Sequence, residues 1–324
     1  MAEQPLRIGT RGSQLALTQT GWVADRLRAV GARVELVRIS TRGDVRTDVP
    51  VHGLGGDGVF VRELEHALLD DRIDVAVHSL KDLPTAVTAG LEVAAVPQRA
   101  LSFDALVTAK GGVTLRTLPP GAVVGTSSVR RIAQVLAVRP DLVVRPLRGN
   151  VDTRLGRLDA GDYEAVVLAG AGLERLGLAD RITEVLDPPT FWPAIGQGAL
   201  ALQIRTGDSR TRDVVTALDD EPTHHAVRAE RSCLAALAGG CLAPIGGWAR
   251  FERPGHLAFG ACVLEMHGHD VTRLEADNGG LGTTASAFPP TAVGESPEEV
   301  GRRAAAALVA RGAEAMLARM RVRA

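Results

Sequence analysis

The segment Asp187-Pro188-Pro189-Thr190-Phe191-Trp192-Pro193-Ala194-Ile195-Gly196-Gln197-Gly198 separates two halves of regular structure. Its three prolines fix φ and remove backbone donors, so the segment is read as a linker and not as a helix or central strand. An apolar run at 199–204 follows and is typical of a buried strand. A strand in that place predicts a return to the first half of the chain, which would give two lobes joined by two crossings.

Both halves alternate strand-like and helix-like segments, which favours open α/β sheets. In the first half we expect strands at 6–9, 34–40, 73–77 and 91–96, and helices at 14–30 and 60–70. In the second half we expect strands at 104–108, 123–125, 142–147 and 165–168, a helix at 129–138, and two more helices that carry Arg154 and Arg175. Residues 1–97 with 198–218 are predicted to form lobe 1, and 98–197 to form lobe 2.

The remainder, 219–324, is predicted to be a small α+β domain. A helix is expected at about 223–238, and strands near 246–251 and 256–264. Ser296-Pro297-Glu298-Glu299 is a capping box with proline at the first helical position, and it predicts one long helix to about Met320. The stretch 270–294 shows no clear period.

Composition narrows the class of function. The 324 residues are 45% hydrophobic and carry a formal net charge of −1, so no bulk field attracts nucleic acid. No apolar run approaches the length of a membrane span. The three cysteines, Cys233, Cys241 and Cys262, lack metal-ligand spacing. We therefore expect a cytoplasmic protein with no bound metal, no nucleic-acid partner and no membrane contact.

Arginines follow the strands of the second half. Arg130 and Arg131 occupy the first turn of the helix after Thr126-Ser127-Ser128, where they oppose the helix dipole unless an anion binds there. Further arginines at the next two strand–helix junctions are Arg148, Arg154 and Arg175. Because guanidinium pairs with carboxylate through two parallel bonds, this set suits a ligand with several carboxylates.

The first half holds two candidate sites of its own. Thr10-Arg11-Gly12-Ser13 joins a strand to a helix, and backbone N–H groups with Arg11 and the N-cap Ser13 predict an anion site; the alternative is a capped helix with a surface arginine. Another strand ends in His78-Ser79-Leu80-Lys81-Asp82-Leu83-Pro84. Only two of the 37 basic residues are lysine, so Lys81 is kept against the chain's bias to arginine. Asp82 beside it could stabilise a cation or move a proton; the alternative is an exposed ion pair.

Cys241 lies in Gly239-Gly240-Cys241-Leu242-Ala243-Pro244-Ile245-Gly246-Gly247, with four glycines and a proline. Such a loop holds the thiol on a tight, sparsely covered turn, where it could carry a group covalently. The alternative is a small, inert residue in a turn.

Seven segments together resemble the porphobilinogen deaminase (hydroxymethylbilane synthase) family: GTRGSQLAL, HSLKDLPT, GTSSVRRIAQ, LRGNVDTRL, LAGAGLERL, IGQGALALQIR and ERSCLAALAGGCLAPIG. The resemblance runs from Arg7 to about Gly247. It implies two lobes like those of type II periplasmic binding proteins, with a cleft between them, plus a third domain that carries the cofactor. It also implies a transferase (EC 2.5.1.61) that joins four porphobilinogen molecules head to tail into hydroxymethylbilane, with release of ammonia, in haem biosynthesis.

The resemblance assigns roles by position. Cys241 matches the cysteine that holds a dipyrromethane cofactor by a thioether, and Asp82 matches the catalytic carboxylate. Cofactor contacts are implied for Ser79, Lys81, Thr126, Ser128, Arg130, Arg131, Arg148 and Arg154. Substrate contacts are implied for Arg11, Ser13, Arg148, Arg154, Arg175 and Gln197. Each pyrrole ring brings two carboxylates, which agrees with the arginines found at the strand ends. We expect a monomer.

The sequence departs from the family in two places. Asp57 stands where the family often has lysine in a glycine-rich loop, and 278–290 match poorly. Two other functions are compatible with a two-lobed fold: a non-enzymatic carboxylate-binding protein and a phosphoribosyltransferase. Neither gives Cys241 a role, and the second would need a metal or phosphate signature.

Overall fold

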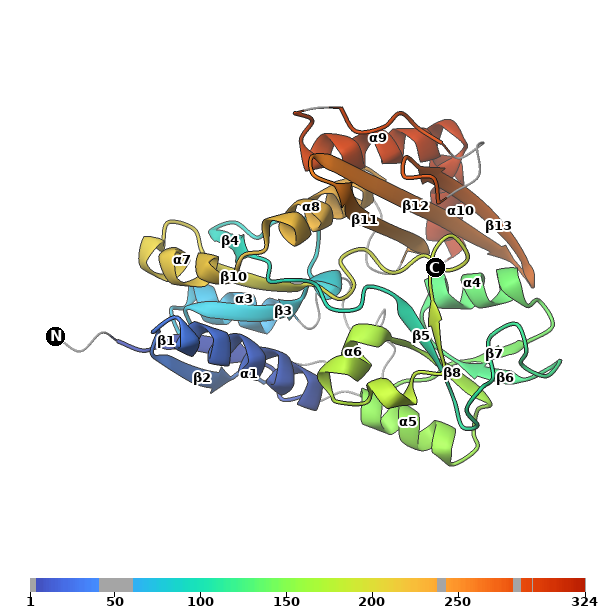
Figure 1. Cartoon of the computed structure of the whole chain (residues 1–324), viewed down its shortest axis with the longest axis horizontal. Helices are drawn as coiled ribbons and strands as arrows, with labels where there is room; N and C mark the ends of the chain where they lie inside the picture. The colour runs from blue at the N-terminus through green and yellow to red at the C-terminus, as the bar shows by residue number, and fades with distance from the viewer. Residues whose placement is uncertain (1–3, 41–60, 238–242, 282–286, 293, 324) are drawn as a thin grey trace. The chain divides into compact units, whose positions relative to one another are not determined.

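A computed structural model describes residues 4–40, 61–237, 243–281, 287–292 and 294–323 (Figure 1). The chain divides into two units, which are described one at a time. The first comprises Met1–Ala100 with Gly198–His224, and the second Leu101–Gln197 with His225–Ala324. The chain therefore passes between the units three times, at 100–101, 197–198 and 224–225, and the first two passages are the crossings that the linker predicted. The finer division into three domains stays a prediction.

The first unit contains one five-stranded sheet of order β2-β1-β3-β10-β4. Its strands are β1 Leu6–Thr10, β2 Val34–Arg38, β3 Val75–Ser79, β4 Leu91–Ala95 and β10 Leu200–Arg205. β1 runs parallel to β2 and β3, whereas β10 runs antiparallel to β3 and β4. The predicted return of the strand after the linker is confirmed, because β10 lies inside this sheet.

Helices pack on the first sheet through apolar stripes. They are α1 Gln14–Ala29, α3 Arg62–Leu69 and α7 Ser209–Val215, with short 3₁₀ turns η2 Leu80–Asp82 and η4 Thr216–Leu218. Val23, Ala24 and Leu27 recur at helical spacing on α1 and are fully buried in one core with strand residues such as Ile8 and Leu202. This packing fixes where the strand ends lie.

The second unit repeats the same sheet. Its order is β7-β6-β8-β5-β9, with β5 Asp104–Thr108, β6 Val123–Gly125, β7 Val143–Arg145, β8 Ala165–Ala169 and β9 Glu184–Leu186. As in the first sheet, the fourth strand is the one that enters from the other unit, and it is antiparallel to its neighbours. The equal strand orders confirm the predicted pair of type II lobes. The helices are α4 Val129–Val138, α5 Val151–Asp159, α6 Gly170–Arg175 and η3 Ala179–Arg181.

A smaller antiparallel sheet completes the second unit. It consists of β11 Ile245–Arg253, β12 His256–His267 and β13 Asp270–Asp277, and it is accompanied by α8 Glu221–Ala236, α9 Pro297–Ala310 and α10 Ala313–Arg323. One expectation is wrong here: the single long helix is broken at Gly312, whose φ of 99° no helix accommodates. Part of the stretch 270–294, for which no element was predicted, forms β13.

The linker itself is buried between lobe 2 and this smaller sheet. Trp192 is fully buried, its ring occupies the space that a side chain at Gly260 would need, and its Nε1 donates to Glu275 Oε1 at 2.9 Å. Gly196 N donates to Glu230 Oε2 at 2.6 Å, and Gly247 N donates to Pro193 O at 2.9 Å. These bonds join the linker to α8, β11 and β13, so the smaller sheet and lobe 2 share one core.

Candidate anion-binding and catalytic site

The junction between β6 and α4 has the geometry that the sequence predicted. Ser128 caps α4, and its Oγ accepts from Arg131 N at 3.5 Å. Thr126 is buried, and its Oγ1 accepts from Ser128 N at 3.3 Å. These bonds fix the turn, so Arg130 and Arg131 stand in the first turn of the helix.

A buried acid that the sequence analysis did not single out faces both arginines. Asp104 begins β5 and is fully buried. Its Oδ2 accepts from Arg130 Nη1 at 2.7 Å, and its Oδ1 accepts from Arg131 Nε at 2.9 Å and Nη2 at 2.7 Å. Burial alone would raise the pKa of Asp104, but the charges of the two arginines outweigh it and hold the pKa well below its usual range. An acidic residue opening an otherwise apolar strand, DALVT, was the available signal.

Gln197 is brought to the same acid. Its Nε2 donates to Asp104 Oδ1 at 3.1 Å and to Ser102 O at 2.9 Å. On the other side, Arg130 Nη1 also donates to Trp192 O at 2.6 Å, and Gln134 both donates to Trp192 O and accepts from Trp192 N. Three predicted site residues of lobe 2 therefore bind one carboxylate, namely Arg130, Arg131 and Gln197, and two more, Thr126 and Ser128, hold the turn that carries the arginines.

The other predicted arginines of lobe 2 add positive charge nearby. Arg154 Nε donates to Gly149 O at 2.8 Å. Burial, together with the like charges of Arg131 and Arg148, lowers the pKa of Arg154 to about 10. Burial also lowers the pKa of Arg175, to about 10, against the opposing effect of Glu174. Because desolvation and like charges disfavour these cations, a bound anion would stabilise them.

This charge distribution fits a group with several carboxylates. Two arginines and one aspartate at the α4 turn leave a formal charge of +1 (2 − 1), and Arg154 makes no ion pair with any described acid. Among the described residues no cluster of three or more His, Cys, Asp or Glu side chains could hold a metal ion. Guanidinium groups with donors to spare are the side chains that a multi-carboxylate cofactor would need.

In the first unit, Arg11 and Ser13 occupy the predicted turn. Ser13 caps α1, and its Oγ accepts from Ala16 N at 3.3 Å. Arg11 lies close enough to the buried His78 for its charge to act there: burial, aided by Arg11, lowers the pKa of His78 to about 4 despite a hydrogen bond to Gln203. His78 is therefore neutral at pH 7.

The strand end that carries the proposed chemistry is held by apolar anchors. Lys81 and Asp82 belong to η2 and are half-buried, whereas Leu80 and Leu83 on either side are buried. Leu83 N donates to Leu80 O at 3.1 Å, which closes the turn. Ser79 exchanges hydrogen bonds with the side-chain amide of Gln19, at 3.1 and 3.2 Å. The turn thus presents Lys81 and Asp82 at the end of β3.

A series of hydrogen bonds that the sequence did not predict links the neutral His78 next to this turn to the acid Glu65. His78 Nε2 lies 2.9 Å from Gln203 Oε1, and Gln203 Nε2 donates to Glu65 Oε1 at 3.0 Å. Thr88 Oγ1 donates to Glu65 Oε2, also at 3.0 Å. The series joins β3, β10 and α3 beneath the strand end.

Two predicted features lie outside the described residues: the loop cysteine Cys241 and Asp57. The other two cysteines are fully buried, and burial raises the pKa of Cys233 to about 12 and that of Cys262 to about 11. Both therefore stay protonated and unreactive at neutral pH.

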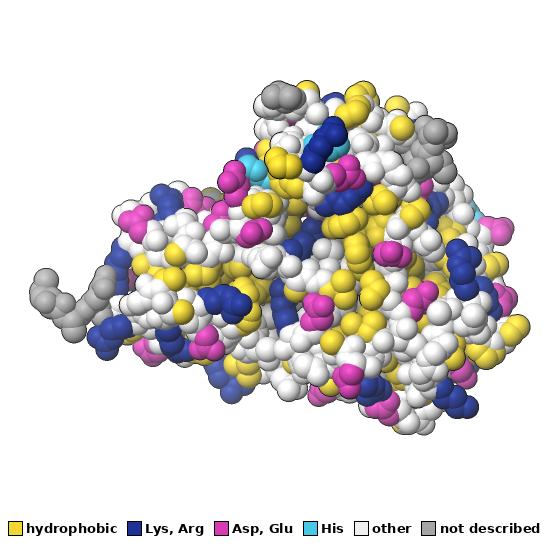
Figure 2. All heavy atoms as spheres, viewed as in Figure 1, with side chains coloured by type: hydrophobic (Ala, Val, Ile, Leu, Met, Phe, Trp, Pro, Cys, Tyr) yellow, Lys and Arg dark blue, Asp and Glu magenta, His cyan; other side chains and the backbone are white. Residues whose placement is uncertain are grey.

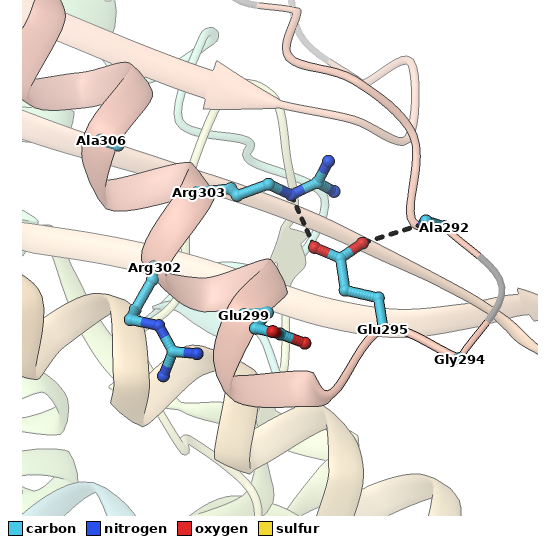
Figure 3. Close-up of a pocket in the computed structure, with 7 residues that line it drawn as sticks. All are labelled: Ala292, Gly294, Glu295, Glu299, Arg302, Arg303 and Ala306. Carbon is cyan, nitrogen blue, oxygen red and sulfur yellow. Dashed lines mark hydrogen bonds and ion pairs between the residues drawn. The ribbon is translucent and has the colours of Figure 1, made fainter.

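On the face seen in Figure 2, basic and acidic side chains are interspersed. A hollow of about 660 Å³ on the smaller domain lies between α9 and the segment before it, where Glu295 pairs with Arg303 at 2.7 Å and accepts from Ala292 N (Figure 3). Glu295 and Arg303 pair with each other there, and Glu299 accepts from Ser296 N and Oγ. No described helix has the length and apolarity needed to cross a membrane.

Comparison with known proteins agrees with the family resemblance that the sequence motifs indicated. The family model described as the porphobilinogen deaminase dipyrromethane cofactor binding domain matches residues 6–213, and the model of the C-terminal domain matches 224–310. Porphobilinogen deaminase of Geobacillus sp. (strain WCH70) is 44% identical over 97% of this chain and 96% of its own length.

Two further relatives with that name agree. The protein of Acidothermus cellulolyticus is 46% identical over 96% of this chain and 91% of its own length, and that of Thermus thermophilus is 50% identical over 83% and 88%. Both family models and full-length relatives therefore show that the chain belongs to the porphobilinogen deaminase family.

Proposed function

We propose that the chain is a hydroxymethylbilane synthase (EC 2.5.1.61), which condenses four porphobilinogen molecules head to tail with release of ammonia. Its dipyrromethane cofactor would be attached to Cys241 and, when bound, supplies the pyrrole to which the first substrate is joined. One observation carries the proposal: lobe 2 encloses more positive than negative charge, although the net charge of the chain is −1. The arginines that supply this charge include Arg131, Arg154 and Arg175.

The arginines would bind and orient carboxylates. Each porphobilinogen carries an acetate and a propionate group, and a guanidinium can bind each of them through two hydrogen bonds. Cofactor contacts are assigned to Ser79, Lys81, Thr126, Ser128, Arg130, Arg131, Arg148 and Arg154. Substrate contacts are assigned to Arg11, Ser13, Arg148, Arg154, Arg175 and Gln197.

Asp82 would act on the reacting substrate. A carboxylate at the end of β3 can hold a proton for the departing amine and stabilise the positive charge that develops on the substrate as ammonia leaves. Leu80 and Leu83 anchor the turn, so the backbone that carries the carboxylate is already held in place before the reaction begins. Lys81, next to it, would bind a carboxylate as a compact point charge.

The test is the intact mass of the purified protein, with peptide mapping of any adduct. We expect an adduct of two pyrrole rings on the peptide that contains Cys241, and none in Cys241→Ser. The buried thiol of Cys233 supplies a matched control, because Cys233→Ala should keep the adduct. Normal turnover by Cys241→Ser would refute the assignment of the carrier.

The non-enzymatic alternative predicts a different result. A carboxylate-binding protein would keep its unmodified mass after incubation with porphobilinogen, whereas an adduct-free enzyme would gain the adduct. We also propose that the chain acts as a monomer and without nucleic acid, which light scattering of the adduct-bearing protein would check.

A further inference from the structure

The inference concerns Asp104 and rests on the proposed function. This carboxylate is enclosed on all sides: its side chain is 0% exposed, and those of Arg130 and Arg131 are 5% and 8% exposed. A buried ion pair seldom adds stability over apolar residues of the same size, since both charges lose their hydration. Stability alone is therefore a weak reason for an acid at this position.

Asp104 fixes the direction of both guanidinium groups. Arg131 uses Nε and Nη2 on Asp104 Oδ1, and its Nη1 donates to Val167 O at 3.1 Å. Three of its five N–H bonds are thereby used, which leaves two (5 − 3), one on each terminal nitrogen. Two anchors on different edges hold the plane of the guanidinium, so the remaining pair of donors has one orientation.

Arg130 is held from the opposite oxygen, through one terminal nitrogen. Its Nη1 donates to Asp104 Oδ2 and to Trp192 O, at 2.7 and 2.6 Å. Without Asp104 the two neighbouring cations would repel each other in a site that excludes water. The acid therefore allows two guanidinium groups to stand side by side while leaving one positive charge in excess.

The arrangement extends to other predicted ligand-binding residues. Gln197 donates to Asp104 Oδ1, and the charge of Arg131 acts on Arg154. We propose that Asp104 is a positioning residue, which holds Arg130, Arg131 and Gln197 in the one geometry that receives the carboxylates of the dipyrromethane cofactor. A ligand then meets donors that are already ordered, and less free energy is lost on binding.

Two variants separate position from charge. Asp104→Asn keeps the shape but removes the charge and turns a donor toward one arginine. Asp104→Glu keeps the charge but displaces the carboxylate by one methylene, and it carries the test if Asp104→Asn does not fold. The matched structural control is Glu265→Gln, since Glu265 is also a buried carboxylate paired with an arginine, Arg319, at 2.6 and 3.0 Å.

The readout is the rate at which adduct-free protein gains the two-pyrrole adduct from porphobilinogen, followed by intact mass. Protein from cells unable to make porphobilinogen provides the starting material. We expect both Asp104 variants to gain the adduct at least about tenfold more slowly than wild type, the effect of about 1.4 kcal/mol in binding. Their KM for porphobilinogen should rise more than kcat falls. Glu265→Gln should gain the adduct at the wild-type rate.

Wild-type uptake by Asp104→Glu would overturn the inference, because the charge alone would then suffice. Wild-type uptake by Asp104→Asn would overturn it too. In both cases the proposed function would stand, because wild-type protein still acquires the adduct. If the wild type itself gains no adduct, the proposed function fails and the role of Asp104 fails with it.

Discussion

The two five-stranded sheets share one strand order but differ in the residue that the incoming strand buries. In lobe 1 that strand is β10, and its Gln203 joins His78 to Glu65. In lobe 2 it is β5, and its Asp104 joins Arg130 to Arg131. In lobe 1 the incoming strand thus places an amide, Gln203, between a neutral imidazole and an acid. In lobe 2 it places a carboxylate, Asp104, between two cations.

The difference shows how one topology supports two tasks. The core of lobe 2 leaves positive charge uncompensated near the strand ends, which favours the binding of anions. The polar chain of lobe 1 brings no cation into its core, and the groups at its strand end are the half-buried Lys81 and Asp82. Function therefore resides in the side chains placed on the repeated fold. On the proposed function, lobe 1 contributes the catalytic carboxylate with some ligand contacts, and lobe 2 contributes most of the arginines that bind carboxylates.

The largest effect expected from this division is on turnover in lobe 1. Asp82→Asn should lower kcat by about 10²–10⁴-fold, the usual contribution of a positioned acid or base, and leave the adduct on Cys241 intact. Steady-state kinetics and intact mass on the same preparation measure both quantities. Asp70→Asn, an exposed acid of the same lobe, is the control. Wild-type turnover by Asp82→Asn would remove this residue from the chemistry.

A smaller effect, in binding, is expected from lobe 2. Arg154→Met should raise KM for porphobilinogen by about 10- to 100-fold, as expected for losing hydrogen bonds from a charged group worth about 1.5–3 kcal/mol. Arg157 lies on the same helix but pairs with Asp162 at the surface, so Arg157→Met is the matched control. If Arg154→Met lowered kcat and left KM unchanged, the division of labour between the lobes would be wrong.

Local pattern was enough to predict the strand–helix junctions. The N-cap Ser13, the start of a helix directly after Ser128 and the return of β10 follow from signals that lie within a few residues of each element. Helix 129–138 has the predicted bounds for the same reason. The position of the arginines at strand ends followed directly from these junctions.

Partners distant in sequence could not be predicted. Gln203 and Glu65 are 138 residues apart, and Arg131 and Asp104 are 27 apart, so no local period connects them. Strand β13 was not predicted, because it is defined by its pairing with β12 and not by an alternation of apolar and polar residues in its own sequence. The break at Gly312 was not predicted, because the apolar residues on both sides of it are by themselves consistent with one continuous helix.

The smallest effect concerns pH and tests whether His78 is neutral in the core of lobe 1. His78 has a pKa of about 4 in the folded chain, below its ordinary value of 6.5, because burial and the charge of Arg11 disfavour the imidazolium. The unfolded chain therefore binds the proton first as pH falls. The stability that neutral His78 contributes is complete above pH 6.5 and is lost between pH 6.5 and about 4.

The comparison with His78→Gln isolates this contribution, since glutamine can still donate to Gln203 but does not titrate. Any advantage in unfolding free energy that the wild type has over the variant at pH 7 should shrink by about 2 kcal/mol at pH 5, which is 1.5 pH units below the ordinary pKa. Urea unfolding at the two pH values measures it. Other titrating groups, such as Asp74, are present in both proteins and cancel. A difference that stays constant would mean that His78 takes up its proton in the folded chain as readily as in the unfolded chain, and so is not held neutral in the core of lobe 1.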